Sequence, residues 1–420
     1  MRNIVILSDM LNYDPGYSIC RVIANQCKML SQNRYKPTLL VKSPFDHRHD
    51  AAYEAKIIEL DHGPCGNNKV VITDETPSAI TQLEEQMRLA LAKADVVLTH
   101  DLIFQDNQWM VRLVAKRIAA ERDDLSWLHW VHSNGDGKVW SRTGQYKEEL
   151  KRPFPHSRLV AMHDEEIARK CRNLKFSRDN VAVVPNPHDF LEYAHPAARQ
   201  AADILDLMRT DIVGIYPCRL DRGKQPHIAI ELFICLNELG HNAKLIIVDQ
   251  HSTGGNKAKY RREMQAMARK AHVSVLFTSS LAGEENGAPF SYCLPHKAVM
   301  DLMEIADVMI HPSRSESDPL ILPEAAWKRC GLVLNIDLTV FRQYAGKAVF
   351  GKFSSSTNIH NGMTGETTTK YTDRHQYMLD IAGKINEMIV SNPQLMLHRE
   401  ARTTRSLEGV WPKLREAIES

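Results

Sequence analysis

Short apolar runs alternate with longer amphipathic segments along most of the 420-residue chain. Between these runs, hydrophobic positions recur with helical spacing, as in residues 78–94 and 108–122. Short apolar strands that alternate with helices are typical of a parallel sheet covered on both faces. The runs that we predict as strands in the first half are residues 3–8, 37–41, 56–60, 95–100, 125–131, 158–162 and 181–184.

The same alternation restarts after residues 193–211, an alanine-rich segment that turns into a short helix and that we interpret as the linker and the entry to a second domain. A chain of this length exceeds one ordinary hydrophobic core. The sequence therefore predicts an α/β protein of two tandem doubly wound domains, residues 1–195 and 205–400. Its polar tract at residues 354–371 is expected to be a surface loop. The predicted strands of the second domain are residues 212–216, 244–248, 273–277, 308–310, 332–335 and 348–350.

Charge adds little to this picture. Lys and Arg number 53 against 51 Asp and Glu, and a net charge of +2 gives no global field toward nucleic acid or an anionic membrane. The basic segment at residues 142–158 is a local exception. Such a run is usually a solvated face, and it is also the place where an anionic acceptor such as a nucleic acid or a phospholipid headgroup would dock.

No apolar run approaches the roughly 20 residues that cross a bilayer, and Met1 leads directly into a short predicted strand in place of a signal peptide. We therefore expect a cytoplasmic protein without a transmembrane segment, and peripheral contact with a membrane stays open. The eight cysteines form no C-x-x-C pair and are expected to be reduced and buried.

Polar residues stand where several predicted strands end, among them His100, His132 and Asn186. In open parallel sheets ligands bind beyond these carboxyl ends, so we expect the residues to line one crevice. The best candidate site is residues 306–327, where an apolar run stops at a polar loop containing Glu316 and a second carboxylate, Glu324, follows after seven residues. A strand, a polar loop and the first turn of a helix offer donors and carboxylate acceptors to a hydroxyl-rich or phosphorylated ligand.

Four separated segments together resemble the GT-B glycosyltransferases, specifically the large retaining family often called family 4. They occur in the order that the family shows and extend over nearly the whole chain. The resemblance implies two Rossmann-like domains with an interdomain crevice, and a final helix at about residues 405–420, containing Trp411, that packs back on the first, acceptor-side domain. The segments are the loop around Gly16, VAVVPNPHDF at residues 181–190, YPCRLDRGKQPHIAIELF at residues 216–233, and the E-x7-E pair Glu316 and Glu324.

The resemblance also implies roles for individual residues. Arg219 and Lys224 follow a predicted strand, where two cations suit the phosphate oxygens of a nucleotide-sugar donor. Glu324 would accept hydrogen bonds from the ribose, and His132 would contact the sugar near the reacting centre. Glu316 and the loop after it would hold the sugar. The remaining donor-binding residues that the resemblance implies are Gly16, Asn186, Ser317, Asp318, Pro319 and Leu320.

The expected activity is retaining transfer of a sugar from a UDP- or GDP-sugar to a hydroxyl acceptor. The acceptor, a glycan, a lipid, a small metabolite or a modified nucleic-acid base, stays open. In the family the leaving phosphate itself accepts the acceptor's proton, so no dedicated protein base is required. Arg219, Lys224 and helix N-termini would neutralise the diphosphate in place of a metal ion, so no metal and no cofactor is expected. The sequence agrees in lacking the Asp-x-Asp metal motif.

Three positions depart from the family pattern: Pro187, Asp249 and Pro319. They leave two alternatives open, a catalytically silent sugar-nucleotide-binding protein and a sugar-nucleotide epimerase or hydrolase on the same fold. These candidate site residues also have a purely structural interpretation, without a role in ligand binding. Arg219 and Lys224 would be a solvated loop pair, and His100 and His132 would be strand-end residues satisfied by the backbone.

Overall fold

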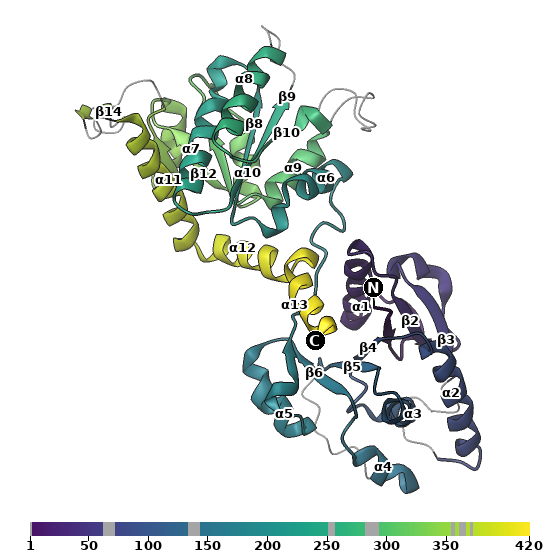
Figure 1. Cartoon of the computed structure of the whole chain (residues 1–420). Coiled ribbons are helices and arrows are strands. Elements are labelled where there is room, and N and C mark those ends of the chain that lie inside the picture. Colours follow the sequence, from purple (N-terminus) through teal and green to yellow (C-terminus); the bar gives the residue numbers. More distant parts are fainter. Residues whose placement is uncertain are drawn as a thin grey trace. The chain divides into compact units, whose positions relative to one another are not determined.

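The computed structural model (Figure 1) describes residues 2–61, 72–132, 143–250, 257–281, 294–353, 358–360, 367–369 and 373–420. The chain divides into two compact units. The first unit is Met1–Asp189 together with Arg405–Ser420, and the second unit is Phe190–Thr404. Both units are α/β, so the predicted fold class of two doubly wound, Rossmann-like domains is confirmed. The expected crevice between two domains stays a prediction.

The first unit contains a seven-stranded sheet in the order β3-β2-β1-β4-β5-β6-β7, and all of its strand pairs are parallel. Helices α1 (Ser18–Gln32) and α13 (Leu407–Glu419) cover one face, and α2 (Thr76–Leu91), α3 (Trp109–Glu121) and α4 (Lys147–Lys151) cover the other. Helix α5 (Ile167–Leu174) lies before the last strand. The strands are β1 Ile4–Leu7, β2 Thr38–Lys42, β3 Lys56–Leu60, β4 Val96–His100, β5 Ser126–Trp130, β6 Ser157–Ala161 and β7 Val181–Val183.

Helix α13 belongs to the first unit although the second unit separates it in sequence. Its residues Leu407, Val410 and Leu414 are buried in the core that α1 covers. His188 and Arg405 lie where the chain leaves the first unit and returns to it. The backbone N–H of His188 donates to the carbonyl of Arg405 at 2.8 Å. The first unit is therefore built from both ends of the sequence.

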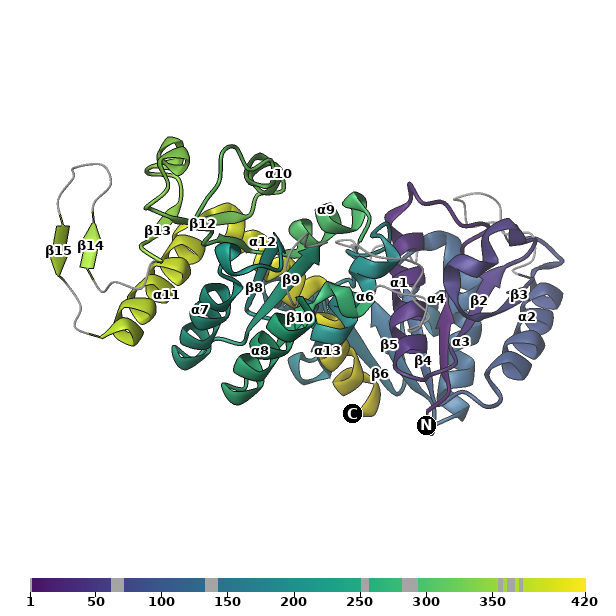
Figure 2. The same ribbon diagram turned by 90° about the horizontal axis from the view of Figure 1, so that it is seen from above.

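The second unit contains a six-stranded sheet in the order β10-β9-β8-β11-β12-β13, again with parallel pairs. Helices α7 (Pro226–Glu238), α8 (Lys257–Lys270) and α11 (Arg374–Ser391) cover one face. Helices α6 (Pro196–Leu205), α9 (His296–Ile305) and α10 (Ile321–Trp327) cover the other. Figure 2 shows α7 and α8 side by side along the sheet. The strands are β8 Ile212–Arg219, β9 Ala243–Gln250, β10 Val275–Phe277, β11 Val308–His311, β12 Gly331–Asn335 and β13 Val349–Gly351.

The alanine-rich segment contains the predicted short helix, but this helix belongs to the core of the second unit and is not a linker. It forms α6, and Ala198 and Ala201 are fully buried against the second sheet. Alanine serves here because a small side chain lets a helix approach a sheet closely. Part of the tract at residues 354–371 also differs from the expected loop, because β14 (Asn358–His360) and β15 (Thr367–Thr369) pair in antiparallel fashion (Figure 2).

Helix α12 (Pro393–Arg405) was not predicted. Its Arg402 is buried and donates from Nη2 to Asp307 Oδ2 at 2.7 Å, and from Nη1 to the carbonyls of Leu207 and Thr210. Asp307 is fully buried and also accepts from the backbone N–H of Val213. The buried ion pair of Arg402 and Asp307, together with the buried Leu395, therefore attaches α12 to the second unit. Within the described ranges, no helix combines the length and apolarity needed to cross a bilayer.

Candidate functional site

The strand order of the second sheet reverses between β8 and β11. In open α/β sheets, ligands bind beyond the carboxyl ends of the strands at this switch point. At this point, hydrogen bonds join the loop that follows β8 to the loop that follows β11. Arg314 donates its backbone N–H to the carbonyl of Gly223 at 2.9 Å, and the buried Gln225 donates to the carbonyl of Pro312 at 2.7 Å. We call Arg219, Lys224, His311, Glu316 and Glu324, carried by this region, the second-unit site.

Lys224, His311 and Glu316 meet in this site. Lys224 Nζ lies 2.5 Å from Glu316 Oε1, and His311 Nε2 lies 2.9 Å from the same oxygen. The three side chains are 18%, 4% and 12% exposed for Lys224, His311 and Glu316. The structure thus brings together the predicted Lys224 and Glu316, which are 92 residues apart in sequence.

The Glu316 carboxylate is ionised in this arrangement. Burial alone would raise its pKa, but hydrogen bonds from His311, Lys224 and Ser313 outweigh the burial and lower the pKa to about 2. One carboxylate oxygen therefore holds two donors. An anionic ligand would have to compete with Glu316 for Lys224.

Arg219 and Glu324 flank this cluster. Arg219 closes β8, and its side chain is 51% exposed, with Nε 4.0 Å from Asp221 Oδ2. Glu324 lies in the first turn of α10 and contacts His296 Nε2 at 3.1 Å. Because α10 has only seven residues, it supplies less of a helix dipole than the sequence suggested, and the site depends on its side chains.

Ser317, Asp318, Pro319 and Leu320 form the link between Glu316 and α10. The carbonyl of Pro319 accepts the N–H of Leu322 at 3.1 Å, and the side chain of Leu320 is 72% exposed. These residues lie where the resemblance placed them. Their contacts with a donor stay a prediction.

The first sheet has its own switch point between β1 and β4, and His132 follows the neighbouring strand β5. His132 Nε2 is hydrogen-bonded to His100 Nδ1 at 2.8 Å, and the two rings stack. The backbone N–H of His132 donates to Asp101 Oδ1 at 2.7 Å. His132 is therefore held on both its ring and its backbone.

Gln26 sets the tautomers of the two histidines. His100 Nε2 lies 2.9 Å from Gln26 Oε1, which can only accept, so His100 donates from Nε2 and accepts at Nδ1. His132 must then donate from Nε2, which leaves its Nδ1 with a lone pair. Burial and the positive charge of Lys170 lower the pKa of His132 to about 4, and burial holds the pKa of His100 well below its ordinary value. Both rings are neutral at pH 7.

Two predicted residues of the first unit have structural contacts already. The N–H of Gly16 donates to Asp14 Oδ1 at 2.8 Å in an Asx-type turn. The amide oxygen of Asn186 accepts from Trp130 Nε1 at 3.2 Å. A donor contact for either residue stays a prediction. Of the basic segment, residue 142 lies outside the described residues.

Sequence reasoning assigned no role to His311, Gln225, Gln26 or Asp101. His311 ends a strand in the same way as His100 and His132, so that signal was present. The other three had no comparable signal. Asp101 is marked only by its backbone, which has φ +54°, a conformation that non-glycine residues rarely adopt.

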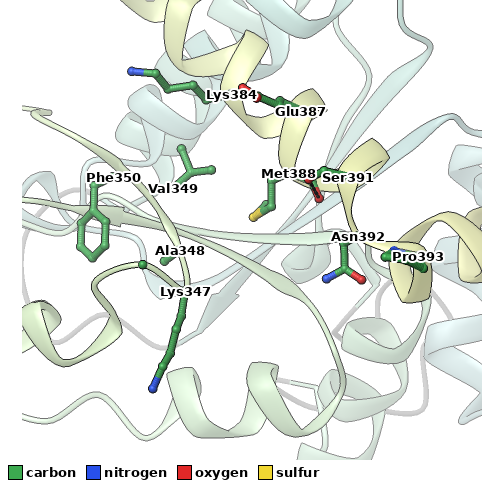
Figure 3. Close-up of a pocket in the computed structure, with 11 residues that line it drawn as sticks. Lys347, Ala348, Val349, Phe350, Lys384, Glu387, Met388, Ser391, Asn392 and Pro393 are labelled. Carbon is green, nitrogen blue, oxygen red and sulfur yellow. Dashed lines mark hydrogen bonds between the residues drawn. The ribbon is translucent and has the colours of Figure 1, made fainter.

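The pocket in Figure 3 lies elsewhere in the second unit. It encloses about 890 Å³ between the start of β13 and the end of α11, and its lining includes Lys347, Lys384, Glu387 and Met388. Figure 3 shows Lys384 and Glu387 on α11, opposite Lys347. The lining mixes both charge signs, and none of the predicted site residues belongs to it.

Among the described residues, one group could be considered for a metal ion: Cys235, Glu238 and His375, whose ligand atoms lie within 4.8 Å of one another. His375 Nε2 contacts Glu238 Oε2 at 3.0 Å. Burial, with the nearby Glu238 and Glu231 charges, raises the pKa of Cys235 to about 12. A histidine–carboxylate contact therefore lies beside a protonated thiol, and none of the three residues belongs to the second-unit site.

Comparison with protein-family models finds no match, and no curated protein sequence matches the chain. Several solved structures align over nearly the full length. HepE from Anabaena, solved with UDP and glucose, is 13% identical, covers 100% of both chains and has a TM-score of 0.37. Sucrose-phosphate synthase from Thermosynechococcus elongatus is 14% identical, with 100% and 98% coverage and a TM-score of 0.36. A glycosyltransferase from Rickettsia africae is 12% identical, with the same coverage and TM-score. Similarity this low does not assign an activity.

Proposed function

We propose that the protein is a retaining glycosyltransferase that moves a sugar from a UDP- or GDP-sugar to a hydroxyl acceptor. The observation that carries this proposal is the contact of Lys224 with Glu316 at the switch point of the second sheet. It joins two motifs that the family resemblance identified separately. The basic loop would bind the diphosphate of a nucleotide sugar, and the neighbouring carboxylate loop would accept hydrogen bonds from the hydroxyls of its sugar ring.

The donor would be held by complementary charges. Arg219 and Lys224 would neutralise the diphosphate, Glu324 would accept from the ribose hydroxyls, and Glu316 would accept from the sugar. Donor binding would draw Lys224 from Glu316 toward phosphate, and His311 would remain to hold the ionised carboxylate. The low pKa of Glu316 supports this role because an ionised carboxylate only accepts hydrogen bonds.

The reaction follows from the same groups. The acceptor oxygen would form a bond to the anomeric carbon while the bond from that carbon to the diphosphate oxygen breaks, and the acceptor's proton would pass to the departing phosphate. Arg219 and Lys224 would stabilise the charge that develops on the diphosphate, the task that a metal ion performs in other transferases. In the first unit, neutral His132 would accept a substrate hydroxyl at Nδ1.

The test is a panel of UDP-, GDP- and ADP-sugars, first by thermal shift and then by hydrolysis and transfer assays. Lys224→Ala and Glu324→Ala should remove activity, and Arg222→Ala is the matched control because Arg222 lies in the same loop with its side chain 78% exposed. Unchanged turnover in both site variants would contradict the site. Retention is read from the anomeric configuration of the product, and metal independence from activity in excess chelator.

The alternative functions give different results in the same assays. Donor binding without turnover would identify a silent binding protein. An altered or hydrolysed sugar formed without acceptor would identify an epimerase or a hydrolase.

A further inference from the structure

The first unit contains a pocket that shares no residue with the predicted site residues. It encloses about 360 Å³ between α3, the end of α4 and the segment after α5. Five of the lining residues are cationic, and no carboxylate is among the described lining residues. The cations are Arg112, Lys116, Lys151, Arg152 and Lys175.

Two of these cations lie inside the protein. Arg112 is 1% exposed and donates from Nη1 to the carbonyl of Ile103 at 2.6 Å. Lys116 is 7% exposed and donates to the carbonyls of Glu149, Leu150 and Arg152. The carbonyl contacts of Lys116 satisfy its hydrogen bonds, but they do not cancel its positive charge. Burial, together with the charges of Arg112 and Arg152, lowers the pKa of Lys116 to about 8, as expected where positive charge is concentrated.

The nearest acidic residues of α4 are engaged by other cations. Glu149 forms a bidentate salt bridge with Arg117, in which Arg117 Nε donates to Glu149 Oε1 at 2.7 Å and Nη2 donates to Oε2 at 3.0 Å. Glu148 pairs with Lys151 at 2.8 Å, so Lys151 contributes less net charge to the pocket. The exposed Arg152 and Lys175 add two cations to its lining. The pocket therefore carries an excess of positive charge.

Apart from Asn173, the remaining described lining residues are apolar. Phe154, Leu174 and Phe176 contribute to it, and they pack against a cluster that contains Ile103 and Val131. The buried His129 ring lies 4.3 Å from Phe154, and burial with the charges of Arg112 and Lys116 lowers its pKa to about 3, so this ring is neutral. A ligand for the pocket needs an anionic group and an apolar part.

We propose that this pocket binds a small phosphate monoester, with the phosphate against Arg112, Lys116, Arg152 and Lys175 and the organic group against Phe154 and Phe176. A phosphate monoester carries nearly two negative charges at neutral pH, which matches several cations better than a carboxylate does. The volume holds a phosphate with one ring or a short chain, not a duplex. Ile103, which lines the pocket, lies two residues along the chain from Asp101, whose carboxylate accepts from the backbone N–H of His132.

This site extends the function proposed above and does not depend on it. It would give the first unit an anionic ligand of its own, either part of the acceptor or an effector. The basic segment at residues 142–158 acquires a defined place here, because residues 150–154 of that segment line the pocket.

The experiment is isothermal titration calorimetry of the full chain with phenyl phosphate, benzoate and benzyl alcohol. Phenyl phosphate should bind at least about tenfold more tightly than benzoate, and benzyl alcohol more weakly still. The double variant Arg152→Ala/Lys175→Ala should weaken phenyl phosphate binding by at least about tenfold. The matched control is Lys147→Ala/Arg172→Ala, which removes the same charge from α4 and α5 outside the pocket lining.

Equal affinity of the double variant and its control would overturn the proposal, and so would binding of benzyl alcohol as tight as that of phenyl phosphate. An oligonucleotide that binds through Arg152 and Lys175 while phenyl phosphate does not would also overturn it, in favour of an extended polyanion. Inorganic phosphate binding as tightly as phenyl phosphate would show that the apolar wall contributes nothing, which contradicts the ligand class. Lys224→Ala should leave this binding within about twofold, so a failure of the donor site and a failure of the pocket remain distinguishable.

Discussion

The two sheets have the same strand order around their switch points, but the side chains placed there differ in kind. In the second unit, Lys224 and Glu316 form an ion pair supported by His311. In the first unit, Gln26, His100 and His132 form a chain of neutral groups. One arrangement can exchange a carboxylate for another anion, and the other presents a lone pair to a hydroxyl.

This difference shows that the fold determines where a site can form, whereas the side chains determine which reaction or ligand it suits. The backbone positions are equivalent: a parallel strand ends, and a polar loop begins. What differs is whether the groups that meet there carry net charge, and this depends on residues distant in sequence. Five experiments test this difference between the two units, and the largest expected change in free energy comes first.

The largest effect is expected for Arg402→Ala in α12, because it leaves the carboxylate of Asp307 buried without its cation. We expect a loss of about 3–5 kcal/mol in stability, confined to the second unit. Hydrogen exchange measured by mass spectrometry would show faster exchange in β8 and β11 and unchanged exchange in β1 and β4. Arg399→Ala is the control, because this arginine lies on the same helix and its Nη2 contacts Met396 of that helix, not Asp307.

Acid should destabilise the two units in different pH ranges. The pKa of His132 falls from an ordinary 6.5 to about 4 in the folded first unit, so the unfolded chain binds more protons and stability is lost as pH falls between these values. The pKa of Glu316 is lowered to about 2, so its contribution is present above about 4.5 and is lost as pH falls toward 2. Each shift corresponds to about 3 kcal/mol.

Fluorescence and hydrogen exchange would follow this prediction. Trp109, Trp127 and Trp130 are fully buried in the first unit, whereas Trp327 of the second unit is 82% exposed. The buried tryptophans should therefore report loss of the first unit at the higher pH. Simultaneous unfolding of both units below pH 4 would contradict the assignment, and Glu316→Gln should remove only the lower range.

Lys224→Ala should weaken binding of the donor nucleotide by about 100-fold, or about 2.7 kcal/mol, because it removes a cation and leaves Glu316 to repel the diphosphate. His132→Ala should leave nucleotide binding within about twofold while it lowers turnover. Calorimetric titration with UDP and GDP separates the two effects. Equal loss of nucleotide affinity in both variants would mean that the two switch points do not have the separate roles inferred above.

Gln26→Glu should change the pH response of the histidine pair. A carboxylate beside His100 Nε2 favours the protonated imidazole, so the pKa of the coupled histidines should rise by about one unit, or about 1.4 kcal/mol. Histidine NMR titration would record the rise, and the acidic limb of the rate profile should move to higher pH. Gln26→Met, which adds no charge, should produce no upward shift.

The smallest effect is expected for Gly383→Ala in α11, where an added Cβ meets nothing within 4 Å. Replacing a helical glycine should stabilise the second unit by about 0.5–1 kcal/mol and leave the first unit unchanged. Chemical denaturation with hydrogen exchange would locate the gain. Gly214→Ala is the opposite case, because its Cβ would lie 2.1 Å from Phe233 Cζ, and it should destabilise.

Much of the fold could be predicted because buried parallel strands are apolar throughout. The run at residues 56–60 corresponds to β3, and the Val308 run corresponds to β11. Helix α12 escaped prediction because its attachment is the buried pair Arg402 and Asp307, and a pairing across 95 positions leaves no periodic signal. The short helix at α6 was predicted, but its burial against the second sheet was not, because composition does not distinguish a linker helix from a close-packed one.

The candidate site was predictable in its members but not in its contacts. The spacing of Glu316 and Glu324 and the placement of Lys224 after a strand are visible in the sequence. That Lys224 and His311 share one oxygen of Glu316 depends on Gln225, whose amide joins the two loops. Likewise, Gln26 reaches His100 across 74 positions, and neither residue alone indicates a tautomer.

The return of α13 to the first unit has a consequence for biosynthesis. Residues 190–404 are synthesised before Leu407, Val410 and Leu414. The first unit therefore lacks part of its core while the second unit is being synthesised. The second unit, which is continuous in sequence, can close first. A nascent chain would therefore expose the α1 side of its first sheet, with Ile23 and Leu30, until its final helix emerges, and chaperones would find their binding surface there.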